Sequence, residues 1–204
     1  MQHLEGIFSL MDPSIAGPLT CFAHGDCWNN NILYRYDDST GKVVEARLID
    51  WQILLLSGPG RDVYHFLTSS TTPEMRKEIG KQLIDHYVDS LMSALEKLGL
   101  SLADEGFDRQ FITAEVEKFK LFGMFNGILY LPAMVDNSLG SKVEELGKDA
   151  SMVANVQEGA DAFSETLDCM TLESVLANKL LCHRLVELVL ETKEALQWTR
   201  CCVC

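Results

Sequence analysis

The chain has few basic residues and no long apolar run. Among its 204 residues, 17 are Lys or Arg and 30 are Asp or Glu, which gives a formal net charge of −13. Nucleic acids and anionic membranes bind through basic surfaces, so this balance disfavours both as partners. No apolar stretch reaches the roughly 18 residues that suggest a transmembrane helix. The start, Met1 to Glu5, also lacks the pattern of a signal peptide, so we expect a cytoplasmic protein.

A disulfide framework is not expected either, although the chain contains seven cysteines. Their number is odd and their spacing is scattered. The terminal Cys201, Cys202 and Cys204 lack the second ligand pair of a zinc site and form a poor prenylation box, so we favour an incidental tail. Cys27 has no recognisable His with an orienting third group, which disfavours a cysteine nucleophile.

The most informative feature is the sequence His-Gly-Asp-Cys-Trp-Asn-Asn-Asn-Ile-Leu, which begins at His24 and is followed later by Leu-Ile-Asp-Trp-Gln. Asn31 stands five residues after Asp26, and Asp50 follows an apolar run, in the order found in protein kinases. In such sites a loop Asp accepts the proton of the attacking hydroxyl, while Asn and Asp oxygens bind the Mg²⁺ of the nucleotide. The pattern therefore predicts Asp26 as the catalytic base, and Asn31 and Asp50 as ligands of magnesium and of the nucleotide it accompanies.

Three motifs together resemble the ecdysteroid kinase-like family, whose relatives are choline kinases and aminoglycoside phosphotransferases. They are His-Gly-Asp-x-Trp-x-x-Asn-x-Leu at 24–33, Leu-Ile-Asp-Trp-Gln at 48–52, and Gly-Pro-x-x-Asp-Val-x-x-Phe-Leu at 58–67. The resemblance implies a protein kinase-like fold that uses ATP and Mg²⁺. It also implies transfer of the γ-phosphate to a hydroxyl of a steroid-like or other small organic molecule. By the same resemblance, His24 and Asp62 brace the catalytic loop.

The resemblance also sets an expectation about domain organisation. A kinase-like fold normally opens with a β-rich N-lobe that carries a Gly-rich loop and a strand Lys. The residues before His24 contain neither feature. We therefore expect residues 1–204 to be a partial kinase-like domain, the C-lobe alone, with a catalytic segment at 20–67 and a helical region at 72–200. The expected fold class is α+β, mostly α, and the exposed surface that an N-lobe would cover predicts self-association.

Strand signals surround the catalytic motif. Residues 20–23 favour a short strand, and the β-rich runs 32–36 and 43–49 flank the turn-forming segment 37–41. This pattern predicts a β-hairpin with Asn31 just before its first strand and Asp50 just after its second. Antiparallel pairing would then bring the two predicted metal ligands together at one end of the hairpin.

Helical signals dominate the rest of the chain. Thr72 followed by Pro73 predicts a helix that starts there and ends at Gly99, and Asp108 predicts the cap of another that runs to Pro132. We also expect a helical remnant at 1–10, an acidic loop region at 136–168 and a final helix from about 172 to 198.

Several residues near these patterns receive a structural interpretation. Trp28 more often packs beneath such a loop than stacks on a ligand, and the Phe residues between 111 and 125 favour a helical core over a substrate pocket. The remaining histidines have no partner at metal-ligand spacing and are interpreted as surface or core residues: His3, His65, His86 and His183.

Two functions of different classes remain open. The first is an ATP-dependent kinase for a small hydroxylated molecule, represented by a C-lobe that would be nearly inactive alone. The second is a non-catalytic binding or regulatory half-domain. The substrate does not follow from the motifs, because sites on one fold vary.

Overall fold

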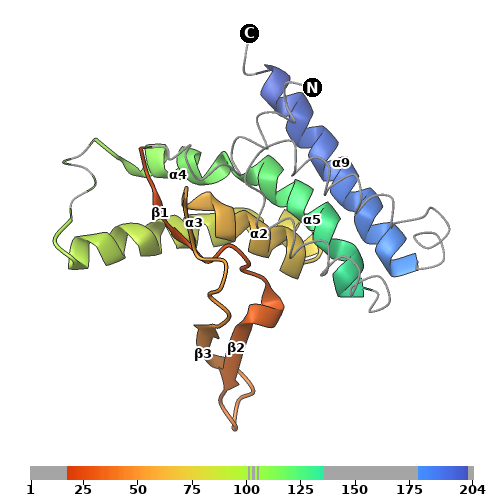
Figure 1. The fold of residues 1–204 in the computed structure, drawn as a ribbon, viewed down its shortest axis with the longest axis horizontal. Coiled ribbons are helices and arrows are strands. Elements are labelled where there is room, and N and C mark those ends of the chain that lie inside the picture. Colours follow the sequence, from red (N-terminus) through yellow and green to blue (C-terminus); the bar gives the residue numbers. More distant parts are fainter. Residues whose placement is uncertain (1–17, 101, 103, 105, 136–178, 202–204) are drawn as a thin grey trace.

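The computed structural model describes residues 18–100, 102, 104, 106–135 and 179–201. They form a mostly helical body with two small antiparallel sheets, in agreement with the expected α+β class (Figure 1). The predicted remnant at 1–10, the acidic region at 136–168 and the end of the Cys-rich tail lie outside the described residues. No helix in the described part is both long and apolar enough to cross a membrane.

The two sheets each contain two strands. β1 (Cys21–Ala23) pairs with β4 (Leu55–Ser57), and β2 (Ile32–Tyr36) pairs with β3 (Val43–Leu48). The second pair is the predicted hairpin, which projects away from the helices (Figure 1). Its turn is held by Asp37, whose Oδ1 accepts hydrogen bonds from the backbone and hydroxyl groups of Ser39 and Thr40. The strand β4 was not predicted, because three residues carry too weak a local signal.

α2 (Gly60–Ser70) lies at the centre of the body and packs against α5 (Lys120–Val135). The two helices approach closely at two glycines of α5. A Cβ on Gly123 would lie 2.5 Å from Cβ of Tyr64, and one on Gly127 would lie 2.9 Å from Cβ of Thr68. The Thr68 hydroxyl also donates to the backbone carbonyl of Gly123 at 2.6 Å. Local signals in residues 60–70 predict no element, so this central helix does not follow from the sequence.

α3 (Pro73–Lys97) agrees with its sequence signals. Thr72 caps it by accepting a hydrogen bond from the Met75 backbone N–H at 3.3 Å, and Pro73 occupies the first turn. Gly99 follows the end of the helix with φ of +77°, the left-handed conformation that glycine adopts readily. α3 packs against α4 (Arg109–Glu117), and its Val88 is fully buried with Ile112 and other core residues.

The prediction of one helix from Asp108 to Pro132 is wrong. Asp108 does cap α4 by accepting a hydrogen bond from the Phe111 backbone N–H at 2.7 Å. The helix ends at Glu117, however, and a second helix, α5, begins at Lys120. At the break, Phe119 donates its backbone N–H to Val116 three residues earlier, and its buried ring occupies the space beside Gly58. Packing of this ring turns the chain, and α5 then continues through Pro132 to Val135. The described part of the predicted final helix is α9 (Lys179–Cys201), which packs on α5.

Candidate active site

The candidate active site lies in the loop between β1 and the short 3₁₀ turn η1 (Asn29–Asn31). Helix α2 supports the start of this loop through Asp62, in its first turn. The Asp62 carboxylate accepts hydrogen bonds from the backbone N–H groups of His24, at 2.6 Å, and Gly25, at 3.0 Å. Gly25 has φ of +85°, and a Cβ there would lie 2.4 Å from the carbonyl oxygen of Ile53, so this position requires glycine.

His24 joins the loop to the segment that leads to Asp50. Its ring is buried, and Nδ1 accepts a hydrogen bond from the Asp26 backbone N–H at 3.3 Å. The other ring nitrogen, Nε2, therefore carries the proton and donates to the Ile49 carbonyl at 2.8 Å. The ring also lies 4.6 Å from the Trp51 ring, centroid to centroid. Every nitrogen of His24 is thus engaged in holding the backbone, and none is placed to act as a base.

Asp26 and Asn31 contact each other directly. The Asn31 side-chain nitrogen Nδ2 donates to the Asp26 carboxylate Oδ2 at 2.8 Å and to the Asp26 backbone carbonyl at 2.9 Å. Both bonds use the amide nitrogen. The amide oxygen Oδ1 of Asn31, which is the atom that would coordinate a cation, takes part in neither.

Asp50 lies beside Asn31 in the hairpin. The Ile49 backbone N–H donates to the Asn31 carbonyl at 2.9 Å, so Asp50 immediately follows the residue that pairs with Asn31. Asp50 is exposed and has φ of +63°, a left-handed conformation that Asp tolerates better than most residues. The structure therefore places the two predicted metal ligands at the same end of the hairpin.

The oxygen donors of this site suit magnesium better than a softer metal. Asn31 and Asp50 offer one amide oxygen and one exposed carboxylate, and Mg²⁺ is commonly held by one or two such groups together with phosphate oxygens and water. In the described residues there is no group of three or more His, Cys, Asp or Glu side chains that would hold a metal by itself. The donor set thus fits a cation that arrives with a nucleotide.

His65 is the residue at the site that sequence analysis missed. From the sequence, His65 is interpreted as a surface or core residue, because it has no partner at metal-ligand spacing. It is indeed buried, but its Nε2 lies 3.7 Å from Oδ1 of Asp26. It stands on α2 three residues after Asp62, so both side chains lie on the side of the helix that meets the loop. That spacing was the available signal, but its use required knowledge that residues 60–70 are helical.

The electrostatic environment shifts the pKa values of Asp26 and its neighbour Cys27 in opposite directions. Burial alone would raise the pKa of the Asp26 carboxyl, but interactions with His65, with the Asn31 amide and with His24 hold that pKa below its usual range. Burial and the negative charges of Asp62 and Asp26 instead raise the pKa of the Cys27 thiol to about 12. At neutral pH the site therefore presents an ionised carboxylate, which can accept a proton, beside a protonated and poorly nucleophilic thiol.

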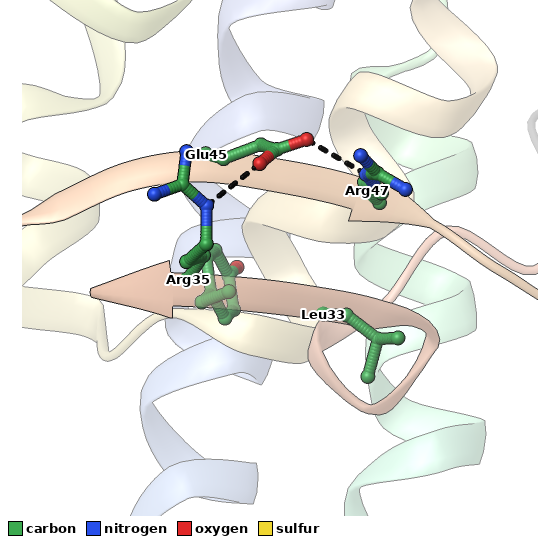
Figure 2. Close-up of a pocket in the computed structure, with 5 residues that line it drawn as sticks. Leu33, Arg35, Glu45 and Arg47 are labelled. Carbon is green, nitrogen blue, oxygen red and sulfur yellow. Dashed lines mark hydrogen bonds and ion pairs between the residues drawn. The ribbon is translucent and has the colours of Figure 1, made fainter. Parts of the chain in front are cut away.

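A hollow of about 200 Å³ lies further along the hairpin, away from the three predicted catalytic and metal-binding residues. Figure 2 shows Glu45 between Arg35 and Arg47, and its carboxylate accepts from the Nε atoms of both, at 2.8 and 2.7 Å. These pairs join neighbouring positions on the surface of the β2–β3 sheet. Both arginines are largely exposed, so we assign the pairs a modest role in hairpin stability.

Comparison with known proteins agrees with the motifs. The model of the ecdysteroid kinase-like family matches residues 1–100, the part that contains all three motifs. Over these residues the chain is similar to that kinase-like family. No curated protein and no solved structure matches the chain.

Proposed function

We propose that this chain carries the catalytic base and the metal ligands of an ATP-dependent small-molecule kinase. The observation that carries the proposal is the direct contact of Asp26 with Asn31, beside Asp50, in a chain that matches the ecdysteroid kinase-like family over residues 1–100. The proposed substrate is a steroid-like or other small organic molecule, and one of its hydroxyl groups accepts the phosphate. ATP is the phosphate donor, and Mg²⁺ is the cofactor.

In the proposed reaction, the substrate hydroxyl lies against Asp26 and its oxygen attacks the γ-phosphorus of ATP. The O–P bond to the substrate forms as the bond from the γ-phosphorus to the β-γ bridging oxygen breaks, and ADP leaves. Asp26 accepts the hydroxyl proton, most directly on Oδ2, since Oδ1 is buried. Asn31 and Asp50 would hold Mg²⁺ through their side-chain oxygens, and this ion neutralises charge on the phosphates.

We expect these 204 residues to have low kinase activity by themselves. They supply a base and metal ligands, but the sequence before His24 contains no Gly-rich loop and no Lys to cover and pair with the phosphates. Weak binding of ATP·Mg²⁺ and turnover close to background are the expected results for the isolated chain. Micromolar affinity from a monodisperse monomer, measured by calorimetry and light scattering, would contradict this part of the proposal.

The test of the catalytic assignment compares two adjacent residues. Phosphorylation of a hydroxylated steroid is followed by mass spectrometry at saturating Mg²⁺ in a full-length version that also carries an N-lobe, and the wild-type sequence is compared with Asp26→Asn and Cys27→Ser. General base catalysis contributes about 10²- to 10⁴-fold, so Asp26→Asn should remove whatever turnover the wild type shows, while Cys27→Ser leaves it nearly intact. Equal losses in both variants would refute the role of Asp26. A full-length version that binds ATP·Mg²⁺ but never transfers phosphate would favour the non-catalytic binding module.

A further inference from the structure

The buried histidine of α2 is part of a chain of polar side chains that ends at the proposed base. His65 is 2 % exposed, and its two ring nitrogens face different elements. Nδ1 lies 3.4 Å from the side-chain nitrogen of Asn126 on α5, while Nε2 lies 3.7 Å from Oδ1 of Asp26 in the loop. Asn126 is also buried, so this contact lies in the packed interface between α2 and α5.

The contact with Asn126 determines where the imidazole proton resides. An amide nitrogen can only donate a hydrogen bond, so Nδ1 of His65 accepts, and the proton of the neutral ring is on Nε2. Nε2 is the nitrogen that faces Asp26. The arrangement thus presents an N–H donor, fixed by two helices, to the proposed base.

The two oxygens of Asp26 have different surroundings. Oδ2 accepts from Asn31, whereas Oδ1 is buried and has no hydrogen bond within the described part of the chain. A buried carboxylate oxygen without a donor is costly, and hydrogen bonds in unliganded catalytic sites are often long and shorten when substrate binds. The Nε2–H of His65 needs only a small approach to satisfy Oδ1.

We propose that His65, oriented by Asn126, is a positioning residue that holds Oδ1 of Asp26 and thereby turns Oδ2 toward the substrate hydroxyl. The inference rests on the proposed function only in giving Asp26 the role of base. The contacts themselves involve no nucleotide. Asn31 and His65 would then hold the carboxylate from two sides, and rotation about its side-chain bonds would be restricted before substrate arrives.

The test uses signals that report the carboxylate without any catalytic assay. In ¹⁵N-labelled full chain, the Asn31 side-chain amide reports the position of Oδ2, and the backbone amides of His24 and Gly25 report whether Asp62 still holds the loop. His65→Phe keeps a ring of similar size but removes the donor. It should shift the Asn31 side-chain signals and leave those of His24 and Gly25 in place. His65→Gln supplies a donor again and should return the Asn31 signals toward their wild-type positions.

A second measurement tests the part played by Asn126. Long-range ¹H–¹⁵N spectra should show the proton of His65 on Nε2 in the wild type and a mixture of tautomers in Asn126→Leu, while His24, whose Nε2 donates to Ile49, stays unchanged as an internal control. The inference would be overturned if the Asn31 side-chain signals did not shift in His65→Phe, or if they shifted equally in His65→Gln. A His65 proton found on Nδ1 would also overturn it. Because no nucleotide is present, these outcomes are independent of whether the chain proves to be a kinase.

Discussion

The carboxylate of Asp62 accepts a hydrogen bond from the backbone N–H of His24 at 2.6 Å, across 38 positions of sequence. With its second bond to Gly25, this side chain attaches the start of the loop that carries Asp26 to the first turn of α2. Further along the helix, Ser70 accepts from the backbone N–H of Asn29 at 2.8 Å. The loop is therefore supported by one helix at both of its ends.

We expect Asp62→Ala to free the loop and to destabilise the fold. Each hydrogen bond to a charged group contributes about 1.5–3 kcal/mol, so the free energy of unfolding should fall by roughly 3 kcal/mol, and the amides of His24 and Gly25 should exchange faster with solvent. Urea denaturation and hydrogen exchange measure both effects. Asp89→Ala, which removes an exposed partner of Arg109, is the control and should change stability by less than about 1 kcal/mol. Equal effects in the two variants would contradict this account of Asp62.

Local sequence signals predicted the elements that depend on local interactions. The hairpin follows from two β-rich runs around a turn, and α3 from Thr72, Pro73 and Gly99. The contact of Asp26 with Asn31 is also local, since their spacing lies within one loop and one 3₁₀ turn.

The features that sequence analysis missed depend on contacts between distant segments. The break at Phe119 is set by packing against Gly58, and β4 forms only by pairing with β1. The position of His65 against Asp26 depends on how α2 packs against the loop, and its polar neighbour Asn126 comes from a third element. No periodicity in the sequence contains that information.

A partly buried ion pair fixes α9 to the body. Arg76 on α3 forms two hydrogen bonds of 3.0 Å with the Glu191 carboxylate and also donates to the carbonyls of Leu67 and Thr71. Arg76→Ala should lower the free energy of unfolding by about 3 kcal/mol, because it leaves an uncompensated, largely buried charge and removes a donor from the Thr71 carbonyl.

The adjacent pair of Lys77 and Glu187 provides the matched control. It joins the same two helices at 3.5 Å, but Lys77 is largely exposed. Lys77→Ala should therefore cost less than about 1 kcal/mol. Thermal or urea unfolding that ranks the two variants in the opposite order would show that the Arg76 pair does not fix α9.

The raised pKa of Cys27 predicts that its thiol is alkylated slowly. A pKa of about 12, against an ordinary 9.0, leaves roughly a thousandfold less thiolate at neutral pH, and the thiolate is the species that reacts with iodoacetamide. Alkylation of Cys27, followed by peptide mass spectrometry, should be very slow at pH 7 and should still accelerate above pH 9. Asp62→Asn, which removes one of the two nearby negative charges, should speed it up. Rapid labelling at pH 7 would contradict the assigned environment.

Exposed apolar side chains on the β1–β4 sheet predict self-association. Phe22 and Leu56 are cross-strand partners, and they are 73 % and 48 % exposed. We expect light scattering to detect oligomers at high protein concentration and Phe22→Lys to reduce them. Leu98→Lys, at an equally exposed position beyond the end of α3, is the control and should leave association unchanged. A monodisperse wild type would refute this expectation.

The central claim is that Asn31 and Asp50 bind the metal of a nucleotide beside Asp26. The most direct measurement replaces Mg²⁺ by paramagnetic Mn²⁺ and records NMR line broadening in the ¹⁵N-labelled chain with ATP, since weak binding in fast exchange is sufficient for the effect. Asp50→Asn keeps a residue that tolerates the left-handed conformation and removes the charge. Mn²⁺ without ATP is the control for general attraction of the cation to a protein of net charge −13. Line broadening at Asp85 and Asp89 on α3 would reveal such nonspecific binding. The account predicts ATP-dependent broadening centred on the Asn31 side-chain amide and the Asp50 backbone, and its loss in Asp50→Asn. Broadening that is independent of ATP, spreads equally to Asp85 and Asp89, or survives in Asp50→Asn would contradict it.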